Sequence, residues 1–159
     1  MQASELNPLL EKPIFDQITE LVADIPGWTP IDELYTLYLL AMSNANQLGN
    51  IVEIGSWCGR STLVLALAAK NIGNKKVYAI DLFPNKDEWV ENEDGSFSFR
   101  VKIQNQLFDG YKDQTVWEEP FKKQILPVYK RWNSIHDALK ENLSKNCLEK
   151  YVTVIKNTS

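Results

Sequence analysis

Two glycines and two acids stand in a pattern that suits the binding of a nucleoside. Gly55 and Gly59 follow a short apolar run, and Glu53 precedes the first glycine by two residues. Asp81 ends a second apolar run, Val77–Ile80. A glycine turn lets a ligand approach the backbone, and an acid at the end of the next strand can accept both ribose hydroxyls. The pattern therefore predicts a nucleoside site on a Rossmann-like sheet.

The spacing of the glycines narrows the choice of nucleoside. The run reads E-x-G-x-x-x-G, whereas dinucleotide-binding enzymes carry G-x-G-x-x-G between a strand and a helix. This difference favours S-adenosylmethionine over NAD. It also argues against the hypothesis that the chain is an NAD-dependent oxidoreductase.

The residues between the glycines and in the following helix have natural roles in such a site. The loop Ser56–Cys58 would lie under the ligand, with the hydroxyl of Ser56 or Ser61 as a polar contact. The first N–H groups of the helix, near Arg60–Thr62, are available to a carboxylate. Glu53 would attract a sulfonium or an amino group, directly or through water. Leu82 and Phe83, after Asp81, offer an apolar wall to an adenine.

Several of these side chains have a second interpretation. Arg60 either binds a carboxylate or covers the end of the sheet. Cys58 begins a helix, where thiols can be reactive, but no base is evident beside it, which favours a packing role. His136 is the only histidine and is expected on the surface or in packing. Trp28 and Trp57 both lie in loops near the proposed site. The sequence identifies no catalytic residue and no metal-ligand spacing.

The remaining pattern predicts alternating helices and strands, as a parallel α/β sheet requires. A Thr29 cap with Pro30 in the first position starts the second helix. The segment 83–130 is an unusually long insertion in which 97–108 fits either a strand or a helix. The expected helices are 13–23, 30–48, 60–71 and 132–146, and the expected strands are 51–54, 77–80 and 151–155.

Size and composition set limits on function. A chain of 159 residues corresponds to one domain. Its net charge of −4, without a basic stripe, argues against nucleic acid. No apolar run approaches the ~20 residues that span a bilayer, and no signal peptide is evident. Two cysteines make no disulfide framework, so we expect a cytoplasmic protein.

The run Ile51-Val-Glu-Ile-Gly-Ser-Trp-Cys-Gly-Arg-Ser-Thr62 resembles the first motif of class I S-adenosylmethionine-dependent methyltransferases. It looks closest to the small O-methyltransferase-like group, with V-E-I-G-x-x-x-G-x-S-T. The resemblance covers about 25–82 and 132–159, and it places the turn Asn157–Ser159 near the adenine. It implies a Rossmann-like three-layer α/β/α fold with a parallel sheet, S-adenosyl-L-methionine as cofactor, and methyl transfer to an unidentified, small-molecule or sugar-type acceptor. The cofactor-binding residues predicted from motif and resemblance together are Glu53, Gly55, Ser56, Trp57, Cys58, Gly59, Arg60, Ser61, Asp81, Leu82 and Ser159.

The sequence departs from that group in two ways. The insertion at 83–130 is expected either to cover the acceptor site or to form an interface. The chain also ends where members of the group continue with a fourth strand, so we expect a fragment lacking the C-terminal half, a truncated gene product or a protomer completed by a partner. We expect one domain, 1–159, with N-terminal helices in 1–50. The strand 51–54 would then be an exposed edge that favours homo-oligomers. The alternative function is a non-catalytic or degenerate S-adenosylmethionine-binding module.

Overall fold

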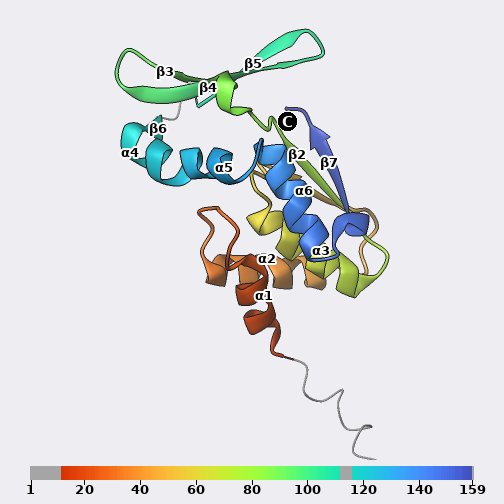
Figure 1. Cartoon of the computed structure of the whole chain (residues 1–159). Coiled ribbons are helices and arrows are strands. Elements are labelled where there is room, and N and C mark those ends of the chain that lie inside the picture. The colour runs from red at the N-terminus through yellow and green to blue at the C-terminus, as the bar shows by residue number, and fades with distance from the viewer. Residues whose placement is uncertain (1–11, 112–115, 159) are drawn as a thin grey trace, which may run out of the picture.

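The computed structural model describes residues 12–111 and 116–158 of the chain. Within them, two sheets are stacked end to end (Figure 1). A parallel sheet of three strands carries the N-terminal and C-terminal helices, and an antiparallel sheet of four strands lies beyond the carboxyl ends of the parallel strands. The antiparallel sheet comes entirely from the segment that the sequence marks as an insertion.

The parallel sheet has three strands in the order β1-β2-β7. They are β1 (Ile51–Ile54), β2 (Val77–Asp81) and β7 (Val152–Lys156). Ile54 pairs with Ile80, and Ile80 pairs with Ile155, so all three strands end at the same edge. In parallel α/β sheets this carboxyl edge is where ligands bind.

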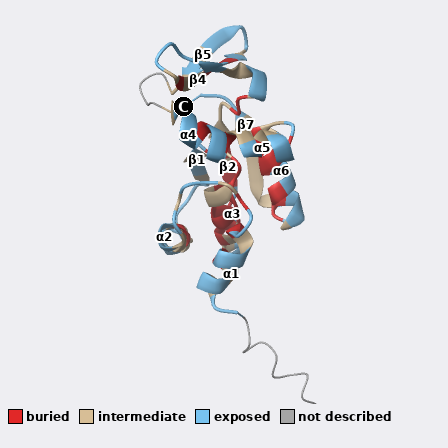
Figure 2. Ribbon diagram, turned by 60° about the vertical axis from the view of Figure 1, so that its left-hand side comes forward, coloured by how far each residue is buried: buried red, intermediate tan, exposed pale blue. Residues whose placement is uncertain are grey.

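Helix α3 (Arg60–Ile72) connects β1 to β2, and it is the most buried helix of the chain's described part (Figure 2). Its side chains pack against the sheet, against α6 (Ile135–Lys145) and against α2 (Ile31–Ser43). Small residues such as Ala66 and Ala69 are fully buried and allow this close approach. The buried residues of α3 are Thr62, Leu63, Val64, Leu65, Ala66, Ala68 and Ala69.

The two faces of the parallel sheet differ. Val152 and Val154 pack against the core that α3 and α6 share. On the opposite face, the side chains of Val52 and Ile54 are 61% and 63% exposed. The structure thus confirms a Rossmann-like α/β fold with a parallel sheet, and its described residues provide helices on one face only.

The insertion forms an antiparallel sheet followed by a helical segment. Its strands are β3 (Trp89–Glu91), β4 (Ser96–Ile103), β5 (Gln106–Gly110) and β6 (Val116–Trp117), with β4 in the centre. The helical segment comprises α4 (Glu118–Pro120), the π-helix η3 (Phe121–Ile125) and α5 (Leu126–Arg131).

The ambiguous stretch 97–108 is therefore strand, not helix. Ile103 pairs with Gln106 across a two-residue turn in which Gln104 and Asn105 both have positive φ, 47° and 68°. These angles are those of a type I′ hairpin turn, which usually carries Asn-Gly or Asp-Gly. With glutamine in the first position, the turn leaves no strong signal in the sequence.

The boundaries of the predicted elements shift by a few residues. Helix α1 spans Ile14–Val22. Helix α2 begins after Pro30, without a side-chain cap from Thr29, and ends at Ser43 rather than at residue 48. Helix α6 begins three residues later than expected because the Ser134 hydroxyl accepts the N–H of Asp137 and caps it there. Among the described helices, none has the length and apolar character needed to cross a membrane.

Candidate functional site

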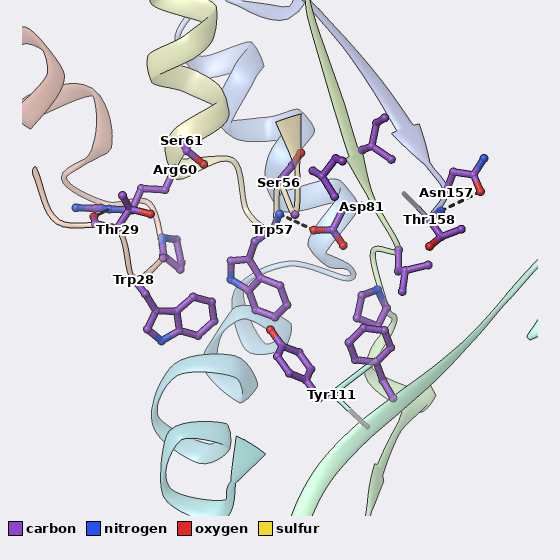
Figure 3. Close-up of a pocket in the computed structure, with 18 of the residues that line it drawn as sticks. Trp28, Thr29, Ser56, Trp57, Arg60, Ser61, Asp81, Tyr111, Asn157 and Thr158 are labelled. Carbon is purple, nitrogen blue, oxygen red and sulfur yellow. Dashed lines mark hydrogen bonds between the residues drawn. The ribbon is translucent and has the colours of Figure 1, made fainter. Parts of the chain in front are cut away.

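A cavity of about 590 Å³ lies at the carboxyl edge of the parallel sheet (Figure 3). One wall is made by the turns after β1 and β2, and the other by the insertion and by the loop before α2. Its lining residues are Pro26, Gly27, Trp28, Thr29, Ile54, Gly55, Ser56, Trp57, Arg60, Ser61, Ile80, Asp81, Leu82, Pro84, Phe99, Asp109, Tyr111, Asn157 and Thr158.

The turn between β1 and α3 depends on its two glycines for different reasons. Gly55 has φ +85°, and a Cβ there would meet nothing within 4 Å. Gly59 has φ +92°, and its Cβ would come within 2.4 Å of Leu139 Cδ1 on α6. Only glycine adopts these angles without strain. Gly55 thus leaves an open surface along the cavity, whereas Gly59, which is not among the lining residues, lets α6 pack on the turn.

Asp81 ties the turns after β1 and β2 together. Its Oδ2 accepts the backbone N–H of Trp57 at 2.9 Å, and its Oδ1 accepts that of Phe83 at 3.0 Å. Trp57 and Phe83 have positive φ, 47° and 46°, which is uncommon for bulky residues. The carboxylate therefore stabilises two strained turns, and each oxygen retains a further lone pair for a ligand hydroxyl.

Ser56 is the residue that most directly indicates a polar ligand. Its side chain is 1% exposed and lines the cavity. The Ser56 hydroxyl finds no hydrogen-bond partner among the residues that the structure describes. Because a buried hydroxyl without a partner is costly, this atom fits a site completed by a polar group of the ligand.

Glu53 and Arg60 are engaged with the protein itself. Glu53 accepts hydrogen bonds from the hydroxyls of Ser61 and Thr62, at 2.6 and 2.5 Å, and does not line the cavity. The Arg60 guanidinium donates to the carbonyls of Thr29, Val22 and Ile25, at 3.1, 2.7 and 2.9 Å. Burial lowers the pKa of Arg60.

These contacts give both charged side chains a structural role. Glu53 fixes the start of α3 to β1, and Arg60 fixes the loop before α2 beside the turn. Arg60 still lines the cavity, but its hydrogen bonds to Val22, Ile25 and Thr29 are a structural role that the sequence did not predict. Contact of either side chain with a cofactor stays a prediction.

Cys58 and His136 lie away from the cavity lining. Cys58 is fully buried, its carbonyl accepts the Asn142 amide at 2.9 Å, and burial raises the pKa of its thiol to about 12. His136 packs on the Phe83 ring at 5.1 Å, and its pKa is lowered, first by burial. Both fit the packing role that the sequence favoured. Ser159 lies outside the described residues, whereas Asn157 and Thr158 line the cavity.

Sequence reasoning named none of the insertion's residues that line the cavity. Tyr111, Phe99 and Asp109 line it. The Tyr111 ring stacks on Trp89 at 5.8 Å and meets Phe99 edge-on at 5.7 Å. Burial and the charge of Asp81 raise the pKa of Tyr111, so its hydroxyl stays protonated near neutral pH. The insertion's many aromatic residues were the available signal, but they gave no position relative to the sheet.

A comparison with known protein families identifies the family of the chain. A family model described as "Methyltransferase domain" matches residues 52–159, more than half of the chain. The match begins in β1 and includes Gly55, Asp81 and the whole insertion. The chain therefore belongs to this family of methyltransferase domains.

Proposed function

We propose that this chain binds S-adenosyl-L-methionine in the 590 Å³ cavity and transfers its methyl group to a small-molecule acceptor, including sugar-type compounds. The observation that carries the proposal is the Ser56–Asp81 side of the cavity. There a buried hydroxyl without a described partner and a carboxylate with lone pairs to spare face the same space, beside the open Gly55 turn.

The lining residues suit the different parts of this cofactor. Asp81 would accept the ribose hydroxyls, as acids after the second strand do in related folds. Leu82, Asn157 and Thr158 would lie around the adenine. Ser56, Ser61 and the backbone N–H groups at the start of α3 would hold the amino-acid end, since a helix N-terminus attracts a carboxylate.

When bound, this cofactor supplies a methyl carbon that forms a bond to the acceptor oxygen or nitrogen as its bond to sulfur breaks, with loss of the acceptor proton. The protein's contribution is to position the acceptor and to exclude water. Tyr111 is suited to orienting a hydroxyl because it stays protonated and its ring is held by Trp89 and Phe99. It is unsuited to removing a proton.

Calorimetry tests the cofactor assignment first. S-adenosylmethionine and S-adenosylhomocysteine should bind to the whole chain, and NAD should not. Asp81→Ala should weaken both adenosyl ligands, while normal binding to this variant would remove Asp81 from the site.

Release of a labelled methyl group then separates the enzyme from the alternative. Cofactor binding with transfer to added hydroxyl compounds supports a methyltransferase. Binding without transfer to any acceptor supports a non-catalytic S-adenosylmethionine-binding module.

Two further proposals concern the setting of the chain. We propose that β1 pairs with a second copy, because it lies at the edge of its sheet and exposes Val52 and Ile54. A Val52→Lys variant should dissociate the dimer in light scattering, and a monomeric parent chain would contradict the proposal.

We also propose a cytoplasmic location, supported by two cysteines, Cys58 and Cys147, that remain unpaired.

A further inference from the structure

A second cavity, of about 370 Å³, adjoins the first. It lies between the loop before α2 and the helical end of the insertion. Four residues, Pro26, Gly27, Trp28 and Trp57, line both cavities. The other residues that line it are Lys123, Gln124, Pro127, Val128, Arg131 and Trp132.

Two indoles form the boundary that the cavities share. The rings of Trp28 and Trp57 lie 5.6 Å apart at an angle of 47°, and both point into the site (Figure 3). The Trp28 indole N–H donates to the side-chain oxygen of Gln124, which joins the loop to the insertion. A flat ring placed here would have aromatic faces beside it and the first cavity within reach.

The two cavities differ in charge. Asp81 and Asp109 line the first, together with Arg60, whose guanidinium is taken up by backbone carbonyls. The second is lined by Lys123 and Arg131 and by no acidic residue. An anionic group is therefore repelled by Asp81 on one side of the first cavity, where Asp109 is paired with Arg100, and is attracted to the second cavity.

Both cations are available to an anionic ligand. Lys123 pairs with Glu119 at 2.5 Å, but the two side chains are 71% and 74% exposed, and such pairs contribute little to stability. The Arg131 guanidinium lies 4.1 Å from the centre of the Trp132 ring and donates to the Asp24 carbonyl at 3.3 Å. A guanidinium has five N–H donors, so Arg131 can bind a carboxylate or phosphate while it keeps these contacts.

We propose that the second cavity is the acceptor subsite and that it takes a ring compound carrying a carboxylate or phosphate. The ring packs on Trp28 and Trp57, and the anion binds Lys123 and Arg131. The role as acceptor subsite rests on the proposed methyl transfer. Ring and anion are chemistry that an aromatic acid and a sugar phosphate share.

The inference can be tested by measuring how two pairs of anionic and neutral ring compounds bind to the whole chain in the absence of cofactor. The anionic probes are para-hydroxybenzoate and glucose phosphate, and their neutral counterparts are para-hydroxybenzamide and glucose. Calorimetry at low salt should show at least one of the two anions binding at least about fivefold more tightly than its neutral counterpart. This preference should fall as the salt concentration rises. Preference for the benzoate indicates an aromatic acceptor, and preference for the phosphate a sugar acceptor. If neither anion is preferred, the inference is overturned.

A neighbouring lysine provides the control. Lys122 and Lys123 each pair with the glutamate four residues earlier, and only Lys123 lines the cavity. Lys123→Gln should weaken the preferred anion by about three- to tenfold, and Lys122→Gln by less than about twofold. Equal effects of the two variants would contradict the subsite. Arg131→Gln gives a second test, with circular dichroism to verify its fold.

A parallel titration keeps this inference separate from the proposed function. S-adenosylhomocysteine binding reports on the first cavity, and Lys123→Gln should leave it unchanged. Normal cofactor binding with no anion preference overturns the subsite alone. Loss of cofactor binding with a Lys123-dependent anion preference overturns the proposed function and leaves an anionic-ring site.

Discussion

The two walls of the larger cavity are built by different means. On the sheet wall, the turns after β1 and β2 present a hydroxyl, a carboxylate and glycine backbone, held by hydrogen bonds of 2.9–3.0 Å. On the insertion wall, Tyr111 and Phe99 present aromatic rings, held by stacking of Tyr111 on Trp89 and by edge-on contacts of Phe99 with both. The sheet wall suits a polar ligand with fixed geometry, and the insertion wall suits a flat ligand.

The difference teaches where each kind of recognition resides. Hydrogen bonds to backbone and carboxylate are directional and specify one ligand, whereas ring faces accept many flat partners. The proposed cofactor, with its fixed polar groups, therefore matches the sheet wall. The proposed ring-shaped acceptor matches the space between the insertion and the loop that carries Trp28.

Gly59→Val should have the largest effect on stability, because it disrupts the packing of α6 on the turn that carries the sheet wall. The valine meets Leu139 at 2.4 Å from its Cβ and must adopt φ +92°. We expect a loss of about 2–5 kcal/mol of unfolding free energy, from strain and overpacking. Urea denaturation followed by circular dichroism measures it. Gly73→Ala, at φ +91° with nothing within 4 Å, is the control and should lose only about 1 kcal/mol.

Asp81→Ala should show that the affinity for the cofactor depends on the sheet wall more than on the insertion wall. It removes the predicted ribose contact and the acceptor of the Trp57 and Phe83 N–H groups. S-adenosylhomocysteine affinity should fall by about 1.5–3 kcal/mol, the range for hydrogen bonds to a charged group. Asp109→Ala removes the carboxylate on the insertion wall and should change affinity by less than about 0.5 kcal/mol. Similar losses in the two variants would contradict the division between the walls.

Trp89→Ala tests the insertion wall. Trp89 contacts Phe99, Tyr111 and Phe121, and its indole N–H donates to the Tyr129 hydroxyl at 2.8 Å. Because the side chain is half-buried, we expect unfolding free energy to fall by about 2 kcal/mol, below the range for a fully buried tryptophan. The affinity for S-adenosylhomocysteine should stay within about threefold, since the sheet wall is intact.

Trp117→Ala is the control for this variant. Its side chain is exposed in the same insertion, so the effect should lie within about 0.5 kcal/mol. If Trp89→Ala abolishes cofactor binding in a folded protein, the two walls are not independent.

The same contrast explains what the sequence could predict. The strand–turn–helix around Gly55 and the acid at Asp81 are local patterns, and the structure places both residues at one cavity. Arg60 shows the limit, because its partners Val22 and Ile25 lie 38 and 35 residues away, and no local pattern indicates such a contact. Tyr111 is the clearest miss. Its position depends on the hairpin turn at Gln104 and on stacking with Trp89, which only the folded insertion specifies.

Burial of the Cys58 thiol in the core behind the sheet wall should make stability depend on pH. Burial raises the pKa of the Cys58 thiol from 9.0 to about 12, so the folded state keeps its proton where the unfolded state loses it. This contribution is complete below pH 9 and is lost as pH rises toward about 12, by about 1.4 kcal/mol per pH unit. Urea midpoints above pH 9 should therefore fall more steeply for the parent chain than for Cys58→Ala. Cys147, which is exposed, supplies the internal control: a thiol reagent should label it in the folded protein and reach Cys58 only after unfolding. Parallel pH slopes, or two labelled thiols in the folded chain, would show that Cys58 is not sealed in the core.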